Sequence, residues 1–200
     1  MSNDKELQNE ARIENSKIKT SKALKTIKKE SIEKEEEIKD LHISSVPQVK
    51  SVTILGALVD ELSKYSKDAI PREAIGLLGG KELRTNELVI TNILFVTEGD
   101  EVSVSFSNED FKAFEEILEN DGYCLGWWHS HPGYGLFLSQ TDIETHIFSF
   151  QLHNALSVAL VIEPTKIDMN GRAAFKFYQV VRDQGVDSYR YQEVASYIQK

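Results

Sequence analysis

Two histidines that stand one residue apart are the first feature of this chain with chemical potential. His129 and His131 lie in the stretch GWWHSHPGYGLFLSQTD, and Ser139 and Asp142 follow after a short loop. On an extended strand, residues i and i+2 point to the same face, so the two imidazoles lie side by side while Ser130 points away. Two nitrogen ligands on one rigid edge supply half of a tetrahedral zinc site.

A helix that begins at Ser139 would bring a carboxylate towards these histidines. The Pro-Gly pair after His131 favours a loop, and the SQTD sequence has the spacing of a helix N-cap with Asp142 at the third helical position. Asp142 would then complete a His-His-Asp set and leave one position open for water, as in catalytic zinc sites. An HxH pair or an SxxD helix start alone is an ordinary structural feature, whereas their combination across one loop is far more specific.

Hydrolysis of an amide at such a site also requires a general base. Glu73 is a candidate, and it heads the run EAIGLLGG, in which three glycines allow close approach of neighbouring backbone. Composition and periodicity do not select Glu73 over the other carboxylates of the chain.

The patterns around these residues predict strands and helices that interleave without a regular βαβ rhythm. The expected strands cover residues 49–54, 73–83, 87–96, 102–106, 123–131, 156–162 and 173–181. The expected helices begin near residues 55, 107 and 139, and a further short helix is expected over residues 186–198. We therefore expect an α+β fold in which a mixed sheet is flanked by helices.

Length and charge predict one folded domain behind a charged extension. Residues 1–46 contain no aromatic residue, Pro or Gly, and residues 1–40 carry ten basic and ten acidic side chains. We expect residues 1–46 to be disordered or marginally helical, with a partner-binding helix as the alternative, and residues 47–200 to form the domain. The whole net charge of −9 then falls on residues 41–200, which disfavours nucleic acid as a partner.

Hydropathy and cysteine content favour a soluble, cytoplasmic protein without a membrane partner. The longest apolar runs, such as Val158–Ile162, are too short to span a bilayer, and the first residues are charged, with no apolar signal segment. The single cysteine, Cys124, excludes an internal disulfide framework and fits a reducing compartment.

The chain carries the spacing of a known catalytic signature, in which a Glu is followed at a distance by His-x-His, seven residues, Ser, two residues and Asp. Glu73, His129, His131, Ser139 and Asp142 meet every spacing. The chain therefore resembles the JAMM, or MPN-plus, family of zinc metalloisopeptidases over roughly residues 47–183. PREAIGLLGG, GWWHSHPGYG and LSQTDIETH are especially similar to the deubiquitinating subunits of the proteasome lid and the signalosome, and a compact archaeal relative is also compatible with them.

The resemblance implies a fold and a set of roles. The fold would be the MPN/JAMM fold, a cytidine-deaminase-like curved mixed sheet with helices on either side. His129, His131 and Asp142 would hold one catalytic zinc ion. Glu73 would take a proton from the attacking water and pass it to the departing amine, and Ser139 would help to stabilise the oxyanion.

The resemblance also implies a substrate class. The enzyme would cleave after the C-terminal Gly-Gly of ubiquitin or a ubiquitin-like modifier, as a deconjugating isopeptidase or a precursor-processing peptidase, alone or in an assembly such as the proteasome. Residues 97–107 would receive the modifier tail as an added strand, and Glu98, Asp100 and Glu101 would suit a tail with arginines, although an ordinary acidic loop is an equal alternative. The functional alternatives are a hydrolase for a small sulfur-carrier-type modifier and a non-enzymatic MPN scaffold.

Overall fold

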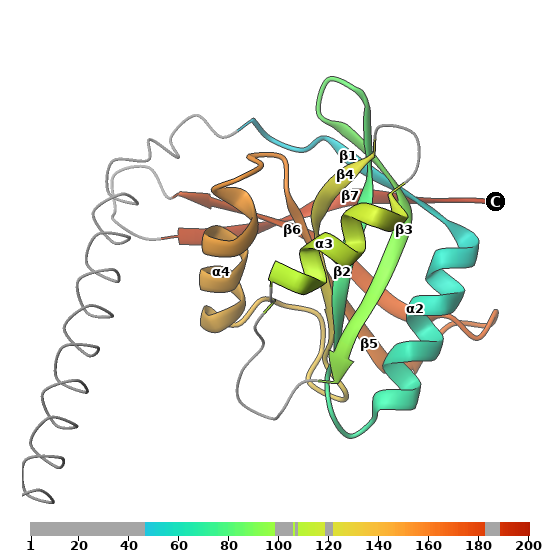
Figure 1. Cartoon of the computed structure of the whole chain (residues 1–200). Coiled ribbons are helices and arrows are strands. Elements are labelled where there is room, and N and C mark those ends of the chain that lie inside the picture. Colours follow the sequence, from blue (N-terminus) through green and yellow to red (C-terminus); the bar gives the residue numbers. More distant parts are fainter. Residues whose placement is uncertain (1–46, 99–105, 107, 119–121, 183–188) are drawn as a thin grey trace, which may run out of the picture. The chain divides into compact units, whose positions relative to one another are not determined.

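The strands pair with one another in a closed cycle, and Figure 1 shows them with the helices around them. The structure, a computed structural model, describes residues 47–98, 106, 108–118, 122–182 and 189–200. The strands are β1 Ser51–Leu55, β2 Ala74–Arg84, β3 Glu87–Glu98, β4 Tyr123–Ser130, β5 Val158–Ile167, β6 Ala173–Arg182 and β7 Tyr189–Gln199. The helices are α2 Gly56–Ala69, α3 Asn108–Ile117 and α4 Gln140–His146, which continues into the π-helical turn η2 Ile147–Gln151.

The sheet is mixed, as predicted. Neighbouring strands follow the order β1-β3-β2-β4-β5-β6-β7, and β7 pairs back onto β1. The pairs β1–β3, β1–β7 and β4–β5 are parallel, and the other four are antiparallel. The predicted α+β fold with a curved mixed sheet and flanking helices is therefore confirmed, and the sheet curves far enough to close.

Two apolar clusters lie on opposite faces of the sheet, because neighbouring residues of a strand point to opposite sides. Trp127 belongs to the cluster that includes residues of α3 and α4, whereas Trp128 belongs to the cluster that includes residues of α2. Figure 1 shows α2 and α4 on different sides of the strands. Both tryptophans are fully buried, and each removes on the order of 200 Å² from water. The strand that carries the histidines is thus fixed from both faces.

Residues 189–199 form a strand, so the predicted short helix over residues 186–198 is wrong for residues 189–198, which the structure describes. β7 pairs antiparallel with β6 and parallel with β1. Tyr189 and Tyr191 pack against one apolar cluster, and Val194 is buried in the other. Residues 189–194 pair with β6 and residues 195–199 pair with β1, and this long-range pairing outweighs the local helical spacing of the segment.

Two further predictions concern residues outside the described part of the chain. The N-terminal extension over residues 1–46 lies there, and so does nearly all of the predicted strand over residues 102–106, with the acidic side chains expected to face a modifier tail. Among the helices that the structure describes, none combines the length and apolar composition that a bilayer crossing requires.

Gly126 lies where β4 is enclosed by its two neighbours, and we expect its replacement by alanine to destabilise the fold. Its φ is +141°, and an added Cβ would lie 1.9 Å from the carbonyl oxygen of Val158 on β5. We predict that Gly126→Ala lowers the free energy of unfolding by about 2–4 kcal/mol, measured by urea titration. Gly171→Ala is the matched control, because Gly171 also has a positive φ of +80° but no atom within 4 Å of an added Cβ. Equal losses in the two variants would contradict the steric explanation.

Candidate metal centre

A strand, a loop and a helix bring the predicted ligands together. His129 lies at the end of β4 and His131 directly follows the strand, while Ser139 caps the N-terminus of α4. Asp142 N donates to Ser139 Oγ at 3.2 Å, and Ser139 N donates to Asp142 Oδ2 at 2.7 Å. This reciprocal capping box, which follows from the SxxD spacing, holds the Asp142 carboxylate at the end of the helix that faces the histidines.

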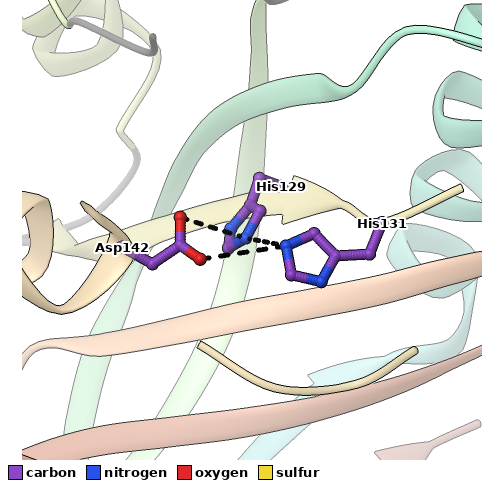
Figure 2. Close-up of side chains that lie close together, drawn as sticks. All are labelled: His129, His131 and Asp142. Carbon is purple, nitrogen blue, oxygen red and sulfur yellow. Dashed lines mark hydrogen bonds and ion pairs between the residues drawn. The ribbon is translucent and has the colours of Figure 1, made fainter. Parts of the chain in front are cut away.

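Figure 2 shows the side chains of His129, His131 and Asp142 directed towards one another. The two Nε2 atoms are 3.0 Å apart. Nε2 of His129 lies 3.5 Å from Asp142 Oδ1, and Nε2 of His131 lies 3.8 Å from Asp142 Oδ2. The histidine side chains are only 1% and 6% exposed, and that of Asp142 is 14% exposed. Three potential ligand atoms thus share one small, largely dry space.

The protonation states in this space suit a metal ion. Burial, together with the neighbouring His129, lowers the pKa of His131 to about 4. Burial alone would raise the pKa of Asp142, but hydrogen bonding and charge attraction from His129, with hydrogen bonds from Ser139, lower it to about 2. At neutral pH His131 is therefore neutral and Asp142 is ionised, which are the forms that bind metal.

A backbone contact fixes the tautomer of His131. Its Nδ1 lies 3.1 Å from the carbonyl oxygen of Gly135, and a carbonyl can only accept a hydrogen bond, so Nδ1 carries the proton. The lone pair of Nε2 is then directed at His129 and Asp142. Histidine ligands of metals are commonly oriented by such a second hydrogen bond.

The donor set fits zinc. Two imidazole nitrogens and one carboxylate oxygen lie within 4.8 Å of one another, and three protein ligands of these types leave a fourth tetrahedral position for water or substrate. Among the described residues, Nδ1 of His129 has no hydrogen-bond partner. Nε2 is the His129 atom that faces the other candidate ligands.

Glu73 reaches the same space from the neighbouring strand. It directly precedes β2, and its Oε1 lies 3.9 Å from Nε2 of His131 with the side chain 35% exposed. Burial raises the pKa of its carboxyl. The close backbone approach expected of the glycines in β2 is confirmed at Gly76, where an added Cβ would lie 1.7 Å from Leu94 O.

Ser130, between the two histidines, has a structural contact that the sequence did not reveal. Its buried hydroxyl accepts a hydrogen bond from Ala74 N at 2.8 Å. Because Ala74 follows Glu73, this bond ties the segment of the candidate base to the strand of the candidate ligands.

His146 contacts the site through Trp127. It is fully buried, and its Nδ1 accepts a hydrogen bond from Trp127 Nε1 at 3.2 Å. Trp127 in turn stacks on His129 with ring centroids 4.5 Å apart. His146 is thus a core residue, whereas His153 is exposed.

We expect His146 to make the fold sensitive to acid. Burial lowers its pKa from 6.5 to about 4, so the unfolded chain binds the proton first as pH falls. Above about pH 6.5 the neutral ring makes its full contribution to the free energy of unfolding. This contribution, about 3 kcal/mol, is lost as the pH falls towards 4. We predict that His146→Gln, whose amide oxygen can still accept from Trp127, flattens the fall in unfolding free energy between these pH values. The exposed His153→Gln serves as control, and equally steep curves for wild type and His146→Gln would contradict this origin.

Comparison with known proteins places the chain in a family. The sequence profile described as JAB1/Mov34/MPN/PAD-1 ubiquitin protease matches residues 47–154, more than half of the 200-residue chain. The chain belongs to this family. The resemblance to the JAMM or MPN-plus enzymes inferred from the motif spacing is therefore confirmed, and the match spans Glu73, both histidines, Ser139 and Asp142.

Curated relatives of this MPN family protein include a subunit of the COP9 signalosome complex and a ubiquitin carboxyl-terminal hydrolase. It is 28% identical over 146 residues to COP9 signalosome complex subunit 5 of Debaryomyces hansenii, which covers 70% of this chain and 31% of that protein. It is 26% identical over 137 residues to ubiquitin carboxyl-terminal hydrolase RPN11 of Saccharomyces cerevisiae, which covers 66% of this chain and 44% of that protein. The chain thus spans less than half of the length of these relatives.

A solved structure shares the fold. The solution structure of protein DSY2949 from Desulfitobacterium hafniense aligns with a TM-score of 0.54 and 19% identity, over 74% of this chain and 93% of that chain. At this identity the likeness concerns the arrangement of the strands and helices alone.

Proposed function

We propose that residues 47–200 form a zinc-dependent isopeptidase or peptidase that cleaves after the C-terminal Gly-Gly of ubiquitin or a ubiquitin-like modifier. The observation that carries the proposal is the convergence of two imidazole nitrogens and one carboxylate within 4.8 Å, with the Glu73 carboxylate 3.9 Å from one of these nitrogens. Membership of the ubiquitin protease family supports the substrate class.

In this proposal each residue of the motif has one task. His129, His131 and Asp142 hold the zinc ion, which would polarise the scissile carbonyl and increase the acidity of a water molecule. Glu73 accepts the proton of that water and delivers it to the departing lysine or α-amine. Ser139 donates its hydroxyl hydrogen to the developing oxyanion. Its hydrogen bond from Asp142 N occupies only a lone pair of the same oxygen, so capping and donation are compatible.

The first alternative function differs from the leading one only in the size of the modifier that is cleaved. A hydrolase for a small sulfur-carrier-type modifier would use the same chemistry on a shorter protein. A non-enzymatic scaffold is the less favoured alternative, because the chain retains all five residues of the motif in the geometry described above.

Cleavage of fusion proteins tests the function directly. The purified chain is incubated with fusions of ubiquitin, of a ubiquitin-like modifier and of a small sulfur-carrier-type protein, each joined through its Gly-Gly, with and without a zinc chelator. We expect cleavage after Gly-Gly of at least one fusion, lost on chelation and restored by zinc. A chain that binds no zinc and cleaves none of the fusions would contradict the proposal.

The proposed partners are proteins conjugated to ubiquitin or a ubiquitin-like modifier, in the cytoplasm. Relatives are named as subunits of the 26S proteasome and the COP9 signalosome, and we include assembly with a complex of this kind in the proposal. The acidic balance of the chain, with a net charge of −9, supports basic protein partners over nucleic acid.

A further inference from the structure

A buried carboxylate lies behind the loop that follows the histidine pair. Glu163 belongs to β5 and is fully buried. β5 runs parallel to β4, with Val161 opposite His129 and Ile162 opposite Ser130. The register therefore places Glu163 level with His131, the next residue along the chain.

Glu163 holds this loop by its backbone amides. Its Oε1 accepts from Gly133 N at 2.9 Å, and its Oε2 accepts from Gly135 N at 2.8 Å. Thr165 adds two donors to Oε1, its backbone N at 3.1 Å and its hydroxyl at 2.8 Å. Burial would raise the pKa of Glu163, but these hydrogen bonds lower it to about 2. The side chain is thus an ionised carboxylate whose charge is balanced by donors from the loop and from its own strand.

Gly135 connects this carboxylate to the candidate metal ligand. Its N–H bonds to Glu163, and its carbonyl oxygen lies 3.1 Å from His131 Nδ1. Gly133 and Gly135 have φ values of +83° and +101°, which glycine adopts without strain. These conformations turn both amides towards the carboxylate, and the second leaves the Gly135 carbonyl facing the imidazole.

We propose that Glu163 is a positioning residue that, through Gly135, fixes the ring orientation and tautomer of His131 and thereby raises the affinity of the site for zinc. This role depends on the zinc function proposed above. A residue that only anchored the loop would affect the stability of the fold alone, whereas this role also affects the orientation and tautomer of His131. Outer partners of histidine ligands generally act in this way.

Zinc affinity provides the first test. Glu163→Gln keeps the size of the side chain but places an amide NH₂ against backbone N–H donors, so we expect the loop to shift and the zinc affinity to fall by about 10- to 100-fold. Affinity is measured by competition with a chromophoric chelator, and the visible absorption spectrum of the cobalt(II) form reports ligand geometry. Glu193→Gln is the matched control, because Glu193 is an exposed carboxylate on β7, and it should leave both readouts unchanged.

A second variant and a second readout cover the case in which Glu163→Gln does not fold. Glu163→Asp retains the charge but withdraws it by one methylene, and we expect a smaller loss of affinity. Nitrogen NMR of the zinc-free, histidine-labelled chain should show His131 protonated on Nδ1 in the wild type and a mixture of tautomers in the variants.

The outcomes separate this inference from the proposed function. Folded Glu163 variants with wild-type zinc affinity, cobalt spectrum and His131 tautomer would overturn the positioning role while leaving the enzyme intact. A wild-type chain that binds no zinc would instead overturn the zinc function, and the positioning role with it.

Discussion

Replacement of Glu73 by glutamine is expected to slow the cleavage of a modifier fusion severely while zinc remains bound. Gln has the size of Glu but cannot accept a proton from water or deliver one to the leaving amine. Positioned general bases contribute about 10²- to 10⁴-fold to such reactions, so we expect a loss of this size in the single-turnover rate. Glu73 lies 3.9 Å from His131 Nε2, but it is not one of the three residues grouped closely enough to hold a metal ion, and zinc content per chain should stay at the wild-type value.

Glu61→Gln is the matched control for this result, because Glu61 is an exposed carboxylate on α2. It should cleave at the wild-type rate. Full activity of the Glu73→Gln chain would show that another group carries the proton. Simultaneous loss of zinc and activity would show that Glu73 acts as a ligand or holds the ligands in place.

The strand–loop–helix unit of the site could be predicted from the sequence because its signals are local. The HxH pair needs only the two-residue period of a strand, and Ser139 and Asp142 need only the spacing of a capping box. The structure contains both features. The packing of both tryptophans against opposite clusters likewise follows from strand alternation.

The closure of the sheet could not be predicted in this way. β7 pairs with β1, so that Ser51 lies opposite Ala195, and no local pattern encodes a contact over that distance in sequence. The apolar residues of this segment fit helical spacing as well as strand spacing, and the two neighbouring strands decide between them.

The supporting residues of the site were missed for a related reason. Glu163 is not part of the sequence motif, and the hydrogen bonds that it accepts from Gly133 and Gly135 come from backbone amides, which the residue types do not reveal. One signal was present, since Glu163 directly follows the buried apolar run from Val158 to Ile162, and a buried charge requires partners. Ser130 offered no comparable signal.

Glu73 and Glu163 come from the two strands that flank β4, Glu73 from just before β2 and Glu163 from β5. β2 lies on one side, with Ile75 opposite His129, and β5 lies on the other, with Val161 opposite His129. Glu73 lies two residues before Ile75, and Glu163 lies two residues after Val161. Because β2 is antiparallel and β5 is parallel to β4, both glutamates are level with His131. His131 is thus level with a candidate proton carrier on one side and a candidate positioning residue on the other, an arrangement that would hold a candidate metal ligand in a fixed orientation beside a candidate base.

Replacement of His129 by alanine should remove zinc itself and so differ from replacement of Glu73. His129 Nε2 lies 3.0 Å from His131 Nε2 and 3.5 Å from Asp142 Oδ1, so its loss leaves two ligands. Loss of a partner one step removed from a metal costs about 10- to 100-fold in affinity, and we expect loss of a direct ligand to exceed about 100-fold. Since a ligand that binds only the folded state stabilises it, the rise in Tm on adding zinc to the wild type should also vanish. His153→Ala, at an exposed histidine, should retain both zinc and the rise in Tm. A folded His129→Ala chain with wild-type zinc affinity would refute the assignment of His129 as a ligand, whereas zinc loss here and zinc retention in Glu73→Gln would divide the site into metal-binding and proton-transfer parts.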